Sequence, residues 1–160
     1  MKGRGEFPSL NVKTPDGLRP GGRPYRIVVV ESKDFQRKQL VQFFESESYM
    51  VVATAANGQE ALDKMSKIEG KIDLVTTALD MPVMDGYAFM HELVKRPNRP
   101  IVVFISEETT KGVMADLIKL GVSDYILKPI DRKTVLYRVK NVLLKQRSEE
   151  HTSELQSRQS

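Results

Sequence analysis

Polar side chains that suit a phosphate-binding site follow several predicted strands, at the points where those strands end. Glu31 and Ser32 come directly after the apolar run IVVV. Ser106 closes PIVVFIS, and Lys128 follows SDYIL. A hydroxyl can donate to a phosphoryl oxygen, a lysine can neutralise it as a point charge, and a carboxylate can bind a hard cation. Each signal is weak alone, because a serine after a strand is usually a helix cap and a lone lysine usually lies in solvent.

The segment IDLVTTALDMPVMDG (72–86) has the layout of a strand that runs into an active-site loop, but its strand ends on Ala78. A nucleophilic carboxylate would be expected there. A methyl group cannot attack phosphorus, so phosphorylation at position 78 is chemically excluded. The neighbouring hydroxyls are not expected to substitute, because Thr77 should point to the opposite side of the strand and Thr76 should lie deeper in the core.

These positions depend on an alternation of apolar strands and amphipathic helices that begins at Tyr25. Short β-branched runs predict strands buried on both faces, and apolar residues at helical spacing predict the helices between them. The expected strands are 25–31, 49–55, 72–78, 100–106 and 123–127. The expected helices are 32–47, 57–70, a helix after the 82–86 loop, one through 113–120, and 131–145. Five successive β–α units imply an α/β fold with a parallel sheet covered on both faces, in which ligands bind beyond the carboxyl ends of the strands.

Length and composition bound the class of protein. A chain of 160 residues with 40% hydrophobic and 29% charged residues suits one globular domain with short appendages. The absence of cysteine excludes disulfides and a cysteine nucleophile. His91, expected on a helix surface, and His151 are too few and too far apart for a histidine metal cluster. No apolar run approaches the roughly 18 residues of a membrane span, so we expect a cytoplasmic protein without membrane contact.

Two terminal segments flank a body at 25–146. Residues 1–24 form an extended, turn-rich basic arm of net charge +3, which either folds against the body or stays mobile. Residues 147–160 lack apolar periodicity and are expected to be a disordered tail. This tail also resembles one reading frame of a common DNA-sequencing adapter, which would make it foreign sequence and leave open an output domain after about residue 146. The body carries a net charge of only +2, so we do not expect nucleic-acid binding as the main role.

The order and spacing of IVVVES, DLVTTALDMPVMDG, PIVVFISEE and GVSDYILKPI resemble the receiver domain of bacterial two-component response regulators, over about residues 25–146. The single-domain, CheY-like chemotaxis regulators are the most similar group, because no output domain follows the last helix. The resemblance implies a flavodoxin-like, doubly wound sheet of five parallel strands in the order 2-1-3-4-5 with five helices. In that family an aspartate ending the third strand accepts a phosphoryl group from a partner histidine kinase, with Mg²⁺ bound beside it.

By position, the resemblance places Ser106 and Lys128 in the phosphoryl pocket and Tyr125 at an aromatic switch. That switch reports phosphorylation to the face formed by the fourth helix, fifth strand and fifth helix. The family's acidic pair falls on Glu31 and Ser32, so one acid is kept and one is lost.

The acceptor position falls on Ala78, and a metal-binding backbone carbonyl falls on Asp80. Two of the three expected carboxylates are therefore absent. We expect little affinity for Mg²⁺ unless the pocket is functional, and no other cofactor. Asp80 is the nearest carboxylate, but the resemblance implies that its side chain points away from the pocket.

Simpler roles are expected for these side chains if no phosphoryl group is present. Lys128 should pair with Glu31 as a structural ion pair. Ser106 either satisfies a backbone group or keeps a ligand role. Tyr125 should be a partly packed strand aromatic and not an active switch.

Two explanations of Ala78 remain open. The favoured hypothesis is a phosphorylation-independent pseudo-receiver without enzymatic activity, which binds a sensor histidine kinase or a downstream target such as a flagellar motor switch protein. The second loss, at Ser32, favours this hypothesis. The alternative is an active phosphoacceptor regulator in which Ala78 is an isolated replacement of the aspartate.

Overall fold

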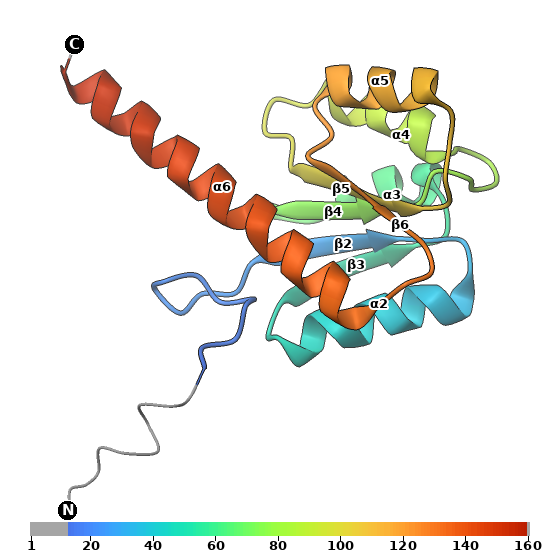
Figure 1. Cartoon of the computed structure of the whole chain (residues 1–160), viewed down its shortest axis with the longest axis horizontal. Helices are drawn as coiled ribbons and strands as arrows, with labels where there is room; N and C mark the ends of the chain where they lie inside the picture. The colour runs from blue at the N-terminus through green and yellow to red at the C-terminus, as the bar shows by residue number, and fades with distance from the viewer. Residues whose placement is uncertain (1–12, 160) are drawn as a thin grey trace, which may run out of the picture.

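The structure, a computed structural model, describes residues 13–159 and the side chains of residues 13–150. Its centre is a sheet of five parallel strands in the order β3-β2-β4-β5-β6 (Figure 1). The strands are β2 (Arg26–Val30), β3 (Met50–Ala55), β4 (Leu74–Thr77), β5 (Ile101–Ser106) and β6 (Asp124–Leu127). Counted from the first strand, this is the predicted order 2-1-3-4-5. The order reverses between β2 and β4, and ligand sites in doubly wound sheets lie at such a reversal.

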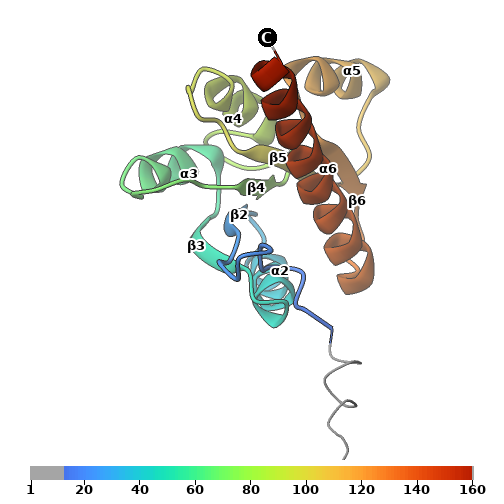
Figure 2. The same ribbon diagram turned by 90° about the vertical axis from the view of Figure 1, so that its left-hand side faces the viewer.

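Five helices cover the two faces of the sheet. They are α2 (Asp34–Ser46), α3 (Gly58–Met65), α4 (Gly86–Leu93), α5 (Lys111–Leu120) and α6 (Arg132–Gln159). The helices α3, α4 and α5 pack on one face, and α2 and α6 pack on the other (Figures 1 and 2). Among the residues that the structure describes, no helix is both long and apolar enough to cross a membrane.

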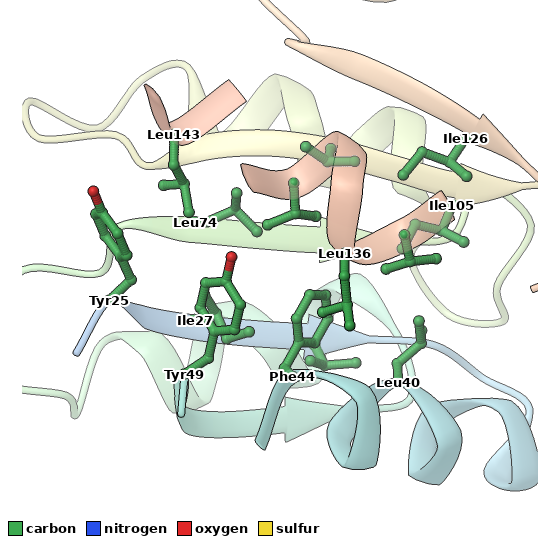
Figure 3. Close-up of a cluster of buried hydrophobic side chains, with 14 residues drawn as sticks. Tyr25, Ile27, Leu40, Phe44, Tyr49, Leu74, Ile105, Ile126, Leu136 and Leu143 are labelled. Atoms are coloured by element: carbon green, nitrogen blue, oxygen red, sulfur yellow. The ribbon is translucent and has the colours of Figure 1, made fainter. Parts of the chain in front are cut away.

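The side chains of each strand alternate between two hydrophobic clusters. In β2, Ile27 faces the cluster under α2 and α6, while Val28 faces the cluster under α3, α4 and α5. Figure 3 shows the first cluster, where Phe44 of α2 and Leu136 of α6 lie beside each other over β2. Because both faces are buried, the strands read as nearly continuous apolar runs, as predicted.

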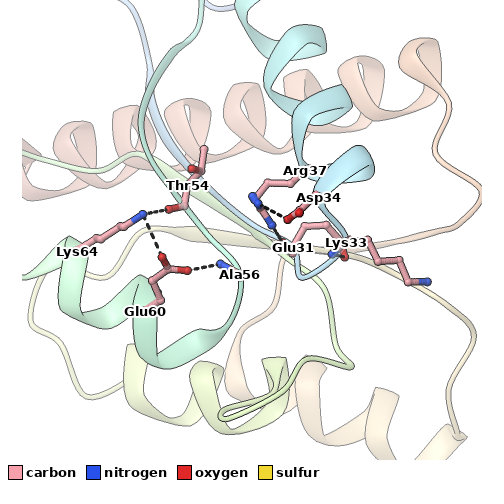
Figure 4. Close-up of polar contacts among 8 residues, drawn as sticks. All are labelled: Glu31, Lys33, Asp34, Arg37, Thr54, Ala56, Glu60 and Lys64. Atoms are coloured by element: carbon pink, nitrogen blue, oxygen red, sulfur yellow. Dashed lines mark hydrogen bonds and ion pairs between the residues drawn. The ribbon is translucent and has the colours of Figure 1, made fainter.

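The predicted start of α3 is confirmed, but its end is not. The Asn57 side chain accepts a hydrogen bond from the Glu60 amide at 2.9 Å. Figure 4 shows the second bond, in which Glu60 Oε1 accepts from the Ala56 amide at 2.5 Å. Asn57 and Glu60 thus both cap the start of the helix, with Glu60 bonding the amide of the residue before the N-cap. The helix ends at Met65, about one turn before Gly70, which lies in the following connection with φ +87°.

The last helix is longer than predicted. Instead of ending at 145 and giving way to a disordered tail, α6 continues to Gln159. The sequence from 132 to 159 contains no glycine or proline, and it is rich in residues of good helix propensity. Because this segment lacks apolar periodicity, it has no apolar face to pack against the body. Its helix propensity nevertheless allows the helix to continue.

The described part of the N-terminal arm, residues 13–24, folds against the body. Gly17 N–H donates to the Glu47 carbonyl at 2.7 Å, and Leu18 forms an isolated antiparallel bridge with Pro24. The arm also contacts α6 through an ion pair, in which the Asp16 carboxylate lies 3.4 Å from Lys140 Nζ. Residues 1–12 lie outside the described residues.

Candidate functional site

The sheet register brings the predicted site residues to one edge. Val30 pairs with Thr77 between β2 and β4, Thr77 pairs with Phe104 between β4 and β5, and Ser106 pairs with Leu127 between β5 and β6. The residues that follow these pairs therefore leave the sheet at the same end. Glu31, Ala78 and Lys128 thus lie beside Ser106 at the carboxyl edge, as the sequence predicted.

A buried ion pair crosses this edge. Lys128 Nζ lies 2.8 Å from Glu31 Oε1, with side chains that are 6% and 1% exposed. The other carboxylate oxygen, Oε2, accepts a hydrogen bond from the Lys33 amide at 3.0 Å. Both oxygens of Glu31 are therefore in use. The expected structural ion pair is present, and in such a buried setting each charge depends on the other.

The start of α2 adds a further contact beside Glu31. Arg37 donates to the Glu31 carbonyl at 2.7 Å and to Asp34 Oδ1 at 2.6 Å (Figure 4). The sequence reasoning did not single out Arg37. The available signal was its spacing, because Asp34 and Arg37 stand three residues apart on a helix.

Ser106 makes a contact with the protein's own backbone. Its hydroxyl, which is buried, accepts a hydrogen bond from the Leu79 amide at 3.0 Å. This is the backbone-satisfying role that the sequence left as one of two alternatives. The contact fixes the first residue of the loop that follows β4.

Ala78 lies at the base of a tightly closed loop. It is 3% exposed. The loop closes through a hydrogen bond from the Gly86 amide to the Leu79 carbonyl at 2.7 Å. A Cβ atom on Gly86 would lie 2.2 Å from the Ala78 carbonyl oxygen, so only glycine fits there.

No neighbouring side chain takes the place of a nucleophile at position 78. Thr77 donates its hydroxyl to the Ala78 carbonyl at 2.9 Å. Thr76 is 1% exposed, and its hydroxyl has no hydrogen-bond partner among the described residues. Leu74 and Val75 belong to opposite clusters, so Thr76 shares the side of Ala78, as predicted. Asp80 is exposed.

Tyr125 is packed beside the edge. Its ring stacks on Phe104 with centroids 5.8 Å apart, and its hydroxyl donates to the Glu107 carbonyl at 2.6 Å. Burial raises the pKa of the Tyr125 hydroxyl. The Ser106 side chain lowers this pKa in part, and the negative charges of Asp80 and Glu107 raise it again. The hydroxyl is therefore a neutral donor near pH 7.

The match to known proteins identifies the class of this domain. The model of the response regulator receiver domain matches residues 27–140. The chain therefore belongs to the response regulator receiver family, and its five-stranded parallel sheet agrees with that membership.

The relatives place the chain among CheY-like receivers. It is 36% identical over 143 residues to the chemotaxis protein CheY of Treponema pallidum, which covers 89% of this chain and 99% of that protein. It is also 36% identical over 110 residues to a protein-glutamate methylesterase/protein-glutamine glutaminase of Symbiobacterium thermophilum, of which it spans 30%. Among solved structures, the CheX–CheY–BeF₃–Mg²⁺ complex of Borrelia burgdorferi contains a chain with TM-score 0.77 and 33% identity. That match covers 82% of this chain and 98% of that one.

The side chains at this edge do not fit the Mg²⁺ ion that receiver domains bind when they are functional. Magnesium prefers near-octahedral oxygen ligands that include carboxylates. Glu31 is held by Lys128 and the Lys33 amide, while Ser32 and Ala78 supply no carboxylate. Within residues 13–150, no group of three or more His, Cys, Asp or Glu side chains could hold a metal ion.

Proposed function

We propose that this chain is a pseudo-receiver: a CheY-like signalling domain that acts through protein binding without phosphorylation at position 78. The observation that carries the proposal is the buried 2.8 Å ion pair between Glu31 and Lys128, beside an alanine at the acceptor position. The pocket contains no nucleophile, and its one lysine is already neutralised.

The ion pair by itself also disfavours the binding of a phosphoryl group in this pocket. A phosphoryl group would need Lys128 as its counter-ion, and taking Lys128 away would leave Glu31 buried without a partner. Removing one partner of a buried pair costs about 3–5 kcal/mol. With no Mg²⁺ to offset that charge, an anion entering the pocket meets an unfavourable carboxylate.

The switch residue has partners that do not involve phosphate. Tyr125 is held by the Phe104 ring and the Glu107 carbonyl, and Ser106 is held by the Leu79 amide. We infer that these contacts keep the region in one arrangement. The domain would then present a constant surface to its partners and would have no catalytic activity of its own.

The partner surface that the family likeness suggests is the face of α5, β6 and α6. Four large apolar side chains are exposed on these elements: Ile118 at 66%, Leu127 at 52%, Tyr137 at 65% and Leu144 at 40%. Exposed apolar groups of this size favour protein contacts. Its partner would be a sensor histidine kinase or a downstream target such as a flagellar motor switch protein, in the cytoplasm.

Phosphotransfer from a small acyl phosphate tests the proposal. The chain is incubated with acetyl phosphate and Mg²⁺, and its intact mass is measured at intervals. We expect no added phosphoryl group on the unaltered chain. A stable aspartyl phosphate on it would overturn the proposal.

The alternative is an active regulator in which Ala78 is an isolated replacement. The observation in its favour is that Ser106, Lys128 and the loop MPVMDG all stand at the same sheet edge. Ala78→Asp distinguishes the two hypotheses. If this single variant accepts phosphate, position 78 was the sole defect. If Ser32→Asp must be added before phosphate is accepted, the pocket has lost both the acceptor and one acid of the acidic pair, as the pseudo-receiver proposal expects.

A further inference from the structure

A cleft of about 1,010 Å³ lies at the amino ends of the strands, on the opposite edge of the sheet from Glu31 and Lys128. The arm, the connections before β4, β5 and β6, and the second half of α6 form its walls. These segments meet at the left of the molecule in Figure 1. Small-molecule sites usually measure about 300–1,000 Å³, so this cleft has room for a sizeable ligand.

Segments on both sides of the matched receiver region contribute to the cleft. Arg19 and Tyr25 precede residue 27, and Leu143 follows residue 140. The arm is held there by the ion pair between Arg19 and Asp73 and by the Arg19 guanidinium, which lies 4.6 Å from the centroid of the Tyr25 ring. The described arm and the second half of α6 therefore add walls to a cleft whose other lining residues lie within the matched region.

The cleft has an excess of positive charge. Asp73 is engaged by Arg19 and by the Arg26 amide at 2.8 Å, so its charge is already used. Arg147 and Glu150 of α6 carry opposite charges. Three further cations that line the cleft form no ion pair with any side chain that the structure describes: Lys71, Arg96 and Arg99.

Structural roles account for only part of this charge. Helix carboxyl ends gather at this edge, and cations stabilise them. Arg99 serves in this way, since it donates to the Leu120 carbonyl at 3.3 Å. The Lys71 and Arg96 side chains have no such bond among the described residues. Their positive charge is available to a ligand.

Part of the cleft lining is apolar. Ile72, Pro100 and Ile101 line it beside Leu143. A guanidinium matches the geometry of a phosphate through paired hydrogen bonds, and an apolar surface accepts a flat ring. We propose that this cleft binds a nucleotide, with its phosphates on Lys71 and Arg96 and its base against the apolar lining.

Titration with nucleotides tests the site. The full chain, labelled with ¹⁵N, is titrated with ATP, GTP and cyclic di-GMP in low salt without Mg²⁺, and amide shifts are followed by NMR. We expect saturable binding of at least one probe, with shifts at residues 71–73 and 96–101. Loss of a charge-assisted hydrogen bond should weaken that binding about tenfold in Arg96→Ala and in Lys71→Ala.

A matched variant on the other edge controls for bulk charge. Lys111 is exposed at the start of α5, away from the cleft, and Lys111→Ala should change the affinity less than twofold. The proposal is overturned if no probe saturates, if the shifts centre on Ser106 and Lys128, or if Lys111→Ala weakens binding as much as Arg96→Ala. It is also overturned if a hexaglutamate peptide binds as tightly as the best nucleotide. Within residues 13–150, neither the Arg96 nor the Lys71 side chain makes a hydrogen bond or ion pair, so both variants should fold.

Discussion

The two edges of the sheet use their charges in opposite ways. At the carboxyl edge, Glu31 and Lys128 are buried and neutralise each other at 2.8 Å. At the amino edge, Lys71 and Arg96 line an open cleft without an ionic partner among the described side chains. A paired, buried charge depends on its partner and cannot bind a ligand, whereas an unpaired charge at a cleft can bind one. The usual ligand-binding edge of this fold is therefore the more closed of the two.

The largest expected effect is the loss of one partner at the carboxyl edge. Lys128→Met should lower the free energy of unfolding by about 3–5 kcal/mol, because Glu31 is left buried and unpaired. Urea unfolding measures the loss. The double variant Glu31→Gln, Lys128→Met removes both charges and should recover much of it. A loss below about 1 kcal/mol in the single variant would contradict a closed edge.

A smaller effect is expected where the arm enters the amino edge. A Cβ atom on Gly17 would lie 2.3 Å from Tyr49 N and 2.5 Å from the Glu47 carbonyl oxygen. Gly17→Ala should therefore displace the arm and cost about 1–3 kcal/mol, measured by thermal or urea unfolding. Gly21→Ala is the matched control, because its Cβ would meet nothing within 4 Å. Equal stability of the two variants would show that the arm does not dock.

Arginine substitutions sharpen the contrast between paired and unpaired charge. Arg96→Ala should change stability by less than about 0.5 kcal/mol, because its half-buried side chain makes no hydrogen bond or ion pair with the described residues. Arg138→Ala should cost about 1 kcal/mol, because Arg138 Nε donates to Asp124 Oδ2 at 2.8 Å and its guanidinium pairs with the same carboxylate. Unfolding midpoints compare the two variants directly. If Arg96→Ala is the more destabilising, Arg96 has a structural role and is not free for a ligand.

The smallest expected effect is a pH dependence at the start of α3. The Ala56 amide, which donates to the carboxylate, holds the pKa of Glu60 below its usual range, and Lys64 adds to this. The folded state therefore binds this proton less readily than the unfolded state does. The stability that the ionised Glu60 carboxylate contributes is present above about pH 4.3. It is lost as the pH falls through the lowered pKa of Glu60. NMR titration of Glu60 gives the pKa, and Glu60→Gln should remove the dependence. A pKa at or above the usual glutamate value would refute this prediction.

Much of the fold and part of the site could be predicted from local patterns. The apolar runs around Val28, Val75 and Val103 predicted buried strands, and their alternation with helices predicted a parallel sheet with Ser106 and Lys128 at one edge. The ion pair was also predicted, because one acid and one lysine were left at that edge. The end of α3 and the length of α6 were not predicted, because helix ends depend on weak local preferences.

The sequence by itself determined the strands and the absence of a nucleophile at Ala78, because periodicity and side-chain chemistry are local properties. The strand order followed from the resemblance to receiver domains. Only the tertiary structure decided how the remaining polar groups are used. The Ser106 hydroxyl contacts an amide 27 residues away, and Arg19 pairs with Asp73 across 54 residues of sequence. Such partners are selected by the packing of strands and helices, which leaves Lys128 enclosed and Arg96 open.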